Sequence, residues 1–220
     1  MSHARLVCVE GVDGAGKTTL VAGLERRLKQ DGLNVGAMHL RSLFDLEFKR
    51  DLVAELPLEL PLTDQELAFV SYSRLYDFYL SDIAPALRAH DLVLLDRYTW
   101  SYLVRWACRD VRWSVLSAVG AMTDLVPPAD FTLLIDAEPF AAYQRKVSGG
   151  LALNRAETLG RGHAQGERAA FVNLQTRALG YYDVLFRGAA PATAARIDSG
   201  GGAAATLDQS LALLRPLVGR

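Results

Sequence analysis

Five short apolar runs recur along the chain, and stretches with helical periodicity or loop composition separate them. The runs cover residues 5–10, 34–40, 91–96, 131–136 and 192–198. Their hydrophobicity is continuous rather than alternating, which is typical of strands buried on both faces of a parallel sheet. The pattern therefore predicts a five-stranded parallel sheet.

Helical signals fill most of the intervals between these runs. After the first run, three leucines four residues apart mark one face of a helix. Thr63 and Glu66 have the spacing of a capping box, which predicts a helix extending to about residue 80. Further helical patterns cover residues 96–122 and 167–186, and residues 200–205, rich in glycine and alanine, read as a loop before the last helix.

This alternation of strands and helices predicts an α/β fold in which helices flank the sheet. Ligands in such folds bind outside the carboxyl ends of the strands. A chain of 220 residues can bury one core, so we expect a single domain over residues 1–220. The segment around residues 145–168 differs in composition from the rest of the chain, because it is rich in glycine and arginine. It reads either as a short lid over the site or as a solvated surface loop.

The composition argues against several classes of protein. A net charge of −1 does not suit a protein that coats nucleic acid or an anionic membrane. Cys8 and Cys108 lack the spacing of a metal site or a disulfide framework. The first residues lack the features of a signal peptide, and no apolar run approaches the ~18 residues of a membrane span. We therefore expect a cytoplasmic protein that acts on a small molecule.

The first apolar run leads into a glycine-rich segment that fits the pattern G-x-x-x-x-G-K-[ST], between a predicted strand and a predicted helix. Glycines there let backbone amides turn onto a polyphosphate, and the helix N-terminus adds its partial positive charge. Lys17 would reach the β and γ phosphates, and the Thr18 hydroxyl would bind Mg²⁺. The expected ATP-binding residues are Gly11, Asp13, Gly14, Ala15, Gly16, Lys17, Thr18 and Thr19.

A second candidate element is the third apolar run, which ends in Asp96 and is followed by Arg97. A carboxylate at the carboxyl end of a central strand can hold the shell of Mg²⁺. The guanidinium of Arg97 can bind a phosphate in a bidentate way. Alternatively, Asp96 caps the next helix and Arg97 forms a surface ion pair. The chain shows no "NKxD" base-recognition element, which argues against a GTPase, and it is short for a motor protein.

Two segments together, "EGVDGAGKTT" and "DRY" followed by Ser101, resemble the thymidylate kinase family of nucleoside monophosphate kinases. The resemblance in spacing extends over most of the chain. It implies a P-loop NTPase fold and a homodimer. It also implies transfer of the γ-phosphoryl group of ATP, with Mg²⁺, to a deoxynucleoside monophosphate, which in this family is dTMP.

The resemblance also assigns roles to individual residues. Asp13 is similar to a carboxylate that contacts the acceptor's sugar, and Arg97 is similar to the arginine that binds the acceptor phosphate. Asp96 resembles the metal-side carboxylate, Arg41 a second phosphate-binding arginine and Arg74 the arginine that reads the base. The acceptor site implied in this way comprises Asp13, Arg41, Phe69, Arg74, Arg97, Tyr98 and Ser101.

A further implied role concerns the lid. Ala15 stands where one subgroup of the family carries an arginine, so positive charge on the transferring group must come from elsewhere. Arg155 in "LNRAE" resembles the lid arginine of the other subgroup, with Arg145 and Arg161 as additional candidates. One such arginine can contribute ~10³ to 10⁵ in rate. The catalytic residues implied are Lys17, Asp13, Arg97 and Arg155.

The chain departs from the family on the acceptor side. The family usually has a phenylalanine four residues before the base-reading arginine, whereas this chain has Val70 there and Phe69 beside it. After the serine that corresponds to Ser101, the family usually continues toward "AYQ", whereas this chain has Val104, Arg105 and Trp106 there. Two alternatives therefore stay open. The protein phosphorylates another nucleotide, a nucleoside or a small metabolite, or it binds ATP as a regulatory protein without turnover.

Overall fold

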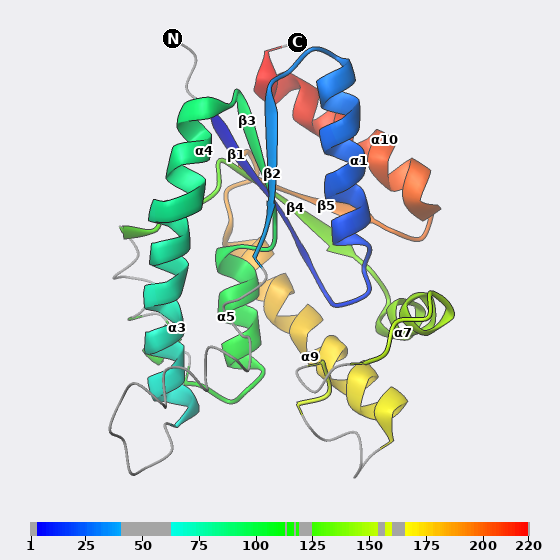
Figure 1. Cartoon of the computed structure of the whole chain (residues 1–220). Coiled ribbons are helices and arrows are strands. Elements are labelled where there is room, and N and C mark those ends of the chain that lie inside the picture. The colour runs from blue at the N-terminus through cyan, green and yellow to red at the C-terminus, as the bar shows by residue number, and fades with distance from the viewer. Residues whose placement is uncertain are drawn as a thin grey trace.

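The computed structural model describes residues 4–40, 63–112, 114–116, 118, 125–153, 157–159 and 166–219. Within them, the predicted parallel sheet is confirmed, with strand order β2-β3-β1-β4-β5 (Figure 1). The central strand β1 therefore lies between β3 and β4. The strands are β1 (Arg5–Gly11), β2 (Val35–His39), β3 (Leu92–Asp96), β4 (Phe131–Asp136) and β5 (Ala194–Asp198).

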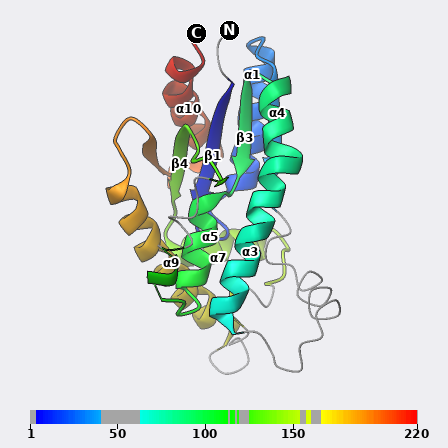
Figure 2. The ribbon, with the colours of Figure 1, turned by 90° about the vertical axis from the view of Figure 1, so that its left-hand side faces the viewer.

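Helices connect these strands, and two of them join end to end through a single π-helical turn (Figure 2). The column that they form runs alongside the sheet. The helical elements are α1 (Lys17–Gln30), α3 (Asp64–Phe78), η1 (Tyr79–Ile83), α4 (Ala84–Ala89), α5 (Thr99–Ala107), α7 (Pro139–Ser148), α9 (Glu167–Gly188), α10 (Gly202–Leu214) and η4 (Arg215–Val218).

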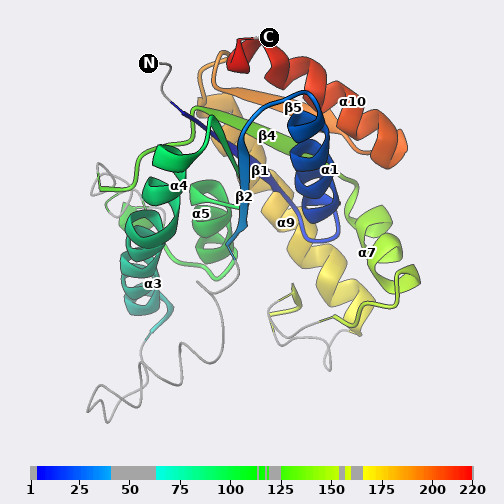
Figure 3. The same ribbon diagram turned by 45° about the horizontal axis from the view of Figure 1, so that its top comes forward.

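Helices cover both faces of the sheet (Figure 3). An apolar core lies on each face, as this arrangement requires. Val7 and Val9 of β1 pack in the core that α1 and α10 cover. Leu6 and Cys8 alternate with them and pack in the core formed with α3, α4 and α5. Because both faces are covered, every one of these side chains is buried, which explains the continuous apolar run in the sequence.

The capping box predicted before α3 is confirmed. The Thr63 hydroxyl accepts a hydrogen bond from the Glu66 backbone N–H at 3.3 Å. The Glu66 carboxylate in turn accepts one from the Thr63 backbone N–H at 2.7 Å. Two N–H groups at the start of the helix are thus satisfied by local partners, so the sequence pattern alone is sufficient to locate this helix start.

Two helix boundaries were predicted wrongly. The helix expected over residues 96–122 ends at Ala107, and Asp110 has a left-handed φ of 63°. Arg177 of α9 donates to the carbonyl oxygens of Ala107 and Cys108, at 3.4 and 3.2 Å, so a distant helix satisfies the end of α5. The loop expected over residues 200–205 is helical from Gly202, since the alanines that follow favour a helix.

Among the described residues, no helix combines the length and the apolar character needed to cross a membrane.

Candidate active site

The glycine-rich segment forms a loop between β1 and α1, at the carboxyl end of the sheet. Gly14 has φ 79°, and a Cβ atom there would lie 2.5 Å from the Ala142 carbonyl oxygen, so only glycine fits. Gly16 has φ 94°, and a Cβ atom there would meet nothing within 4 Å. The loop therefore packs closely on one side and leaves space at the N-terminus of α1, where a phosphate group fits.

Lys17, the first residue of α1, is buried against this loop. Its Nζ atom donates to the carbonyl oxygens of Gly11 and Val12 at 2.9 and 2.5 Å. Burial, reinforced by the nearby charge of Arg97, lowers the pKa of the Lys17 ammonium to about 7. A polyphosphate in the loop would favour the charged form again, so the ammonium is placed to respond to an anion.

Asp96, at the end of β3, is buried and lies beside the loop. Its Oδ2 atom accepts a hydrogen bond from the Thr18 hydroxyl at 2.5 Å and lies 2.7 Å from Nδ1 of His39. Its Oδ1 atom is buried and has no hydrogen-bond partner among the described residues. This unpaired oxygen and the Thr18 hydroxyl could hold Mg²⁺.

The set of protein ligands for such an ion is small. Within the described parts of the chain, no group of three or more His, Cys, Asp or Glu side chains could bind a metal by itself. Mg²⁺ usually keeps several waters and is held by one or two protein oxygens plus the phosphates of a substrate. The residues at this site therefore fit a nucleotide-bound Mg²⁺ rather than a metal held by protein alone.

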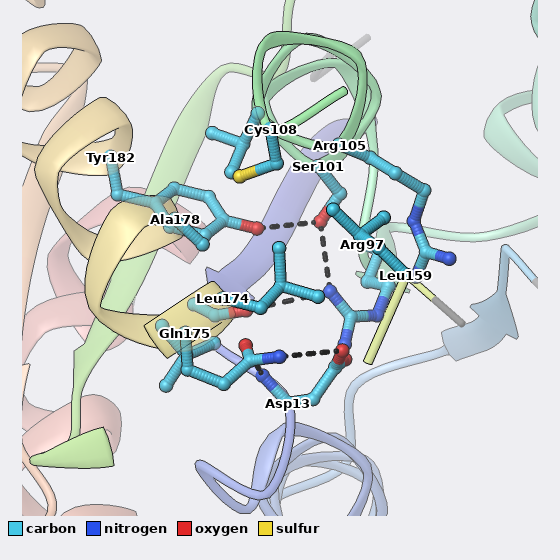
Figure 4. A pocket seen from close by; sticks show the side chains of 13 residues that line it. Asp13, Arg97, Ser101, Arg105, Cys108, Leu159, Leu174, Gln175, Ala178 and Tyr182 are labelled. Carbon is cyan, nitrogen blue, oxygen red and sulfur yellow. Dashed lines mark hydrogen bonds and ion pairs between the residues drawn. The ribbon is translucent and has the colours of Figure 1, made fainter. Parts of the chain in front are cut away.

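Arg97 faces Asp13 across the end of the sheet (Figure 4). Its Nη2 atom donates to the Asp13 carboxylate, and its Nη1 atom donates to the Ser101 hydroxyl at 3.2 Å. The backbone of Arg97 has φ 74°, a strained conformation for a residue other than glycine, and its N–H donates to the Val9 carbonyl oxygen at 3.0 Å. Such strain persists where the surroundings hold it, commonly at functional sites.

The Asp13 carboxylate is kept ionised by its surroundings. Burial by itself would raise the pKa of this carboxyl, but the charges of Arg97, Arg105 and Lys17 outweigh burial. The pKa of Asp13 is therefore held well below its usual range. Arg97 contacts this carboxylate directly, and the charges of Arg105 and Lys17 act on it as well, so Asp13 lies in a region of positive charge.

A buried carboxylate that sequence reasoning missed, that of Glu10, holds the start of α5. It accepts hydrogen bonds from the backbone N–H groups of Tyr98 at 2.9 Å and Ser101 at 3.1 Å. The Ser101 hydroxyl also donates to it, and the Tyr182 hydroxyl does so at 3.3 Å. The available signal was a lone carboxylate in an otherwise apolar strand, because a buried charge needs several partners.

A pocket that is partly open to solvent lies between the loop, α5 and α9 (Figure 4). Three residues predicted for the acceptor site line it, namely Asp13, Arg97 and Ser101. Sequence reasoning did not predict that α9 contributes to this wall. The lining includes Gln175 and Tyr182 from that helix and Arg105 from α5.

Comparison with known proteins agrees with this geometry. A family model described as thymidylate kinase matches residues 9–164, which is most of the chain. The chain belongs to the thymidylate kinase family. It is 31% identical to the probable thymidylate kinase of Archaeoglobus fulgidus over 64% of this chain and 68% of the relative.

Two further relatives have similar identity. The chain is 30% identical to a thymidylate kinase of Mycoplasma pneumoniae, over 68% of this chain and 71% of the relative. It is 31% identical to a thymidylate kinase of Xanthomonas campestris pv. campestris, over 77% of this chain and 71% of the relative. The resemblance seen in the sequence is thereby confirmed, and with it membership of a family of nucleoside monophosphate kinases.

Other residues predicted for the thymidylate kinase acceptor site lie outside the pocket lining. Phe69 is 45% exposed on α3, and Arg74 is exposed on the same helix. Arg145, a candidate for the lid, donates instead to the Ser199 hydroxyl and carbonyl oxygens at 3.0 and 3.1 Å. Arg41 of the predicted acceptor site lies outside the described residues, and so do the lid candidates Arg155 and Arg161. Their assigned contacts stay predictions.

Tyr98 provides a test of one of these assignments. Its ring is fully buried in the core on the α3 side, and its hydroxyl donates to the Pro127 carbonyl oxygen at 2.9 Å. We expect Tyr98→Phe to lower the free energy of unfolding by ~1 kcal/mol, since it removes a part-buried hydrogen bond to the Pro127 carbonyl oxygen. The KM for the acceptor should be unchanged. Chemical denaturation and steady-state kinetics would check both, and a raised acceptor KM at full stability would instead support a substrate contact.

Proposed function

We propose that this protein transfers the γ-phosphoryl group of ATP to dTMP, giving ADP and dTDP. The observation that carries the proposal is the meeting of two halves at the carboxyl end of the sheet. The glycine-rich loop with Lys17 suits the triphosphate. Asp13 belongs to the same loop, and its carboxylate pairs with Arg97 on the acceptor side. Relatives named thymidylate kinases support dTMP as the acceptor.

The chemistry follows from where the charges lie. An oxygen of the dTMP phosphate attacks the γ-phosphorus in line, and the bond from that phosphorus to the β–γ bridging oxygen breaks. Lys17 neutralises charge on the β and γ phosphates, while the Thr18 hydroxyl and the Asp96 carboxylate hold the shell of Mg²⁺. Held there by Thr18 and Asp96, Mg²⁺ would supply positive charge to offset the charge that develops on the phosphates. Catalysis is thus mostly positioning and electrostatics.

On the acceptor side, Arg97 holds the dTMP phosphate and Asp13 contacts the sugar. Asp13 holds Nη2 of the Arg97 guanidinium and Ser101 holds Nη1, which fixes the plane in which the guanidinium meets a phosphate. Arg155 closes over the transferring group from the lid, which also excludes water that would otherwise hydrolyse ATP. Arg41 and Arg74 complete the proposed acceptor site.

A different acceptor is the second candidate function, and one observation favours it. Arg105 lines the pocket at the place where the family has "AYQ", and its charge acts on Asp13. A half-buried guanidinium there adds a donor that an acceptor with an extra carboxylate, phosphate or carbonyl oxygen would use. Such an acceptor would leave the ATP side unchanged.

Measured ADP release with a panel of nucleoside monophosphates would separate these functions. With Mg²⁺ and ATP, we expect kcat/KM to be highest for dTMP. It should fall roughly 10-fold for dUMP, which lacks one methyl group. A higher value with another acceptor would favour the second candidate. ATP binding without ADP release for any acceptor would leave a regulatory ATP-binding protein.

We also propose that the protein is a cytoplasmic homodimer. Phe69 and Leu80 are 45% and 49% exposed, and they lie eleven residues apart on the continuous column of α3 and η1. Eleven residues are close to three helical turns, so the two side chains lie near one face and offer apolar area to a second copy. Light scattering that gave the mass of a monomer at micromolar concentration would overturn this assignment.

A further inference from the structure

Helix α9 reaches the phosphate loop through one buried side chain, that of Gln175 (Figure 4). The Gln175 carboxamide oxygen accepts a hydrogen bond from the Asp13 backbone N–H at 2.9 Å. Its carboxamide nitrogen donates to Oδ2 of Asp13 at 3.3 Å. One carboxamide, only 2% exposed, therefore holds both the main chain and the side chain of the same loop residue.

The two oxygens of the Asp13 carboxylate have different partners. Oδ2 accepts from Gln175, and Oδ1 accepts from Nη2 of Arg97. A carboxylate held at both oxygens has a fixed plane, whereas one held at a single oxygen can rotate about its χ2 torsion. The direction in which Arg97 presents its guanidinium therefore depends on the contact between Asp13 and Gln175.

The same helix holds the second partner of Arg97. Nη1 of Arg97 donates to the Ser101 hydroxyl, and that hydroxyl lies 2.9 Å from the Tyr182 hydroxyl of α9. Gln175 and Tyr182 lie two helical turns apart on the buried side of α9, and both line the pocket. Helix α9 thus supports the Arg97 guanidinium from two directions.

We propose that Gln175 is a positioning residue for the acceptor half of the site, holding Asp13 so that Arg97 meets the acceptor phosphate at the correct angle. This inference rests on the proposed function of Asp13 and Arg97. On the ATP half, Gln175 contacts the main chain of the loop at the Asp13 N–H, whereas Lys17 is held separately by the carbonyl oxygens of Gly11 and Val12. Loss of the Gln175 contacts should therefore change acceptor kinetics and spare ATP binding.

The first test is Gln175→Met, which keeps the length of the side chain and removes both hydrogen bonds. We expect the acceptor KM to rise and kcat to fall, each by roughly 10-fold, because small misplacements of a reacting group are costly. The Kd for ATP should stay within about 2-fold of wild type. Asn173→Met, at an exposed position of the same helix, is the matched control and should behave as wild type. A wild-type acceptor KM and kcat, or an equal loss on the ATP and acceptor sides, would contradict the proposal.

The second test is a double-mutant cycle with Asp13→Asn, using whichever nucleoside monophosphate the wild type phosphorylates best. If Gln175 acts through Asp13, the double variant should lose roughly no more activity than the worse single variant. Independent, multiplicative losses would overturn the proposal. If Gln175→Met fails to fold, Gln175→Glu is used in its place. The glutamate side chain has nearly the same volume as glutamine, and its carboxylate would repel the Asp13 carboxylate at Oδ2 and displace it. A best acceptor other than dTMP would overturn the proposed function without affecting this cycle.

Discussion

Lys17→Ala is expected to lower kcat/KM by ~10³-fold, because it removes the ammonium that neutralises the β and γ phosphates. The free energy of unfolding should change by no more than ~2 kcal/mol, because two effects oppose each other. The carbonyl oxygens of Gly11 and Val12 lose a donor. Burial already disfavours the charged form of Lys17, as the lowered pKa of about 7 indicates, so its removal relieves a desolvation cost. Thermal unfolding and a coupled assay for ADP release would measure the two effects separately.

The control for this variant is Lys29→Ala, in the same helix. Lys29 is exposed and pairs with Glu25 at 2.7 Å, so its loss removes an equal charge without touching the loop. We expect wild-type turnover from it, and a stability change within about 1 kcal/mol. Turnover of Lys17→Ala equal to that of Lys29→Ala would overturn the assignment of the loop as the triphosphate site.

Arg97→Ala is the second variant with a large expected effect. Phosphoryl transfer should fall by at least ~10³-fold, since the acceptor phosphate loses its guanidinium, while the Kd for ATP stays within about 3-fold. Arg97→Lys should recover only part of the activity, because lysine keeps the charge and loses the planar fork. Single-turnover kinetics and nucleotide titration would check these expectations.

Stability must be separated from chemistry for Arg97, because its loss leaves the Asp13 carboxylate buried without its main partner. The double variant Asp13→Asn/Arg97→Ala removes that unpaired charge. We expect it to regain stability relative to Arg97→Ala without regaining turnover. Recovery of turnover in the double variant, or weakened ATP binding with normal transfer in the single variant, would contradict the role given to Arg97. Arg187→Ala, at an exposed site near the end of α9, is the neutral control.

Much of the acceptor half could not be predicted from the sequence, and Tyr98 and Gln175 illustrate why. The position of Tyr98 next to Arg97 suggested a substrate contact, but the turn at Arg97 directs its ring into the core. Gln175 carried no motif at all, since a glutamine in a long helix is ordinary. Its importance depends on a partner 162 residues away, Asp13, and the packing of α9 against α5 and α7 brings the two together.

The sequence by itself determined the five strands, the capped start of α3 and the loop that suits a triphosphate. These features depend on local patterns, namely runs of apolar residues, a capping box and a glycine motif followed by Lys17. Only the tertiary structure decided where α5 ends and which residues support Asp13 and Arg97. Those outcomes depend on hydrogen bonds that involve Arg177, Gln175 and Tyr182 of α9. Contacts between segments so far apart in the chain leave no periodic trace in the sequence.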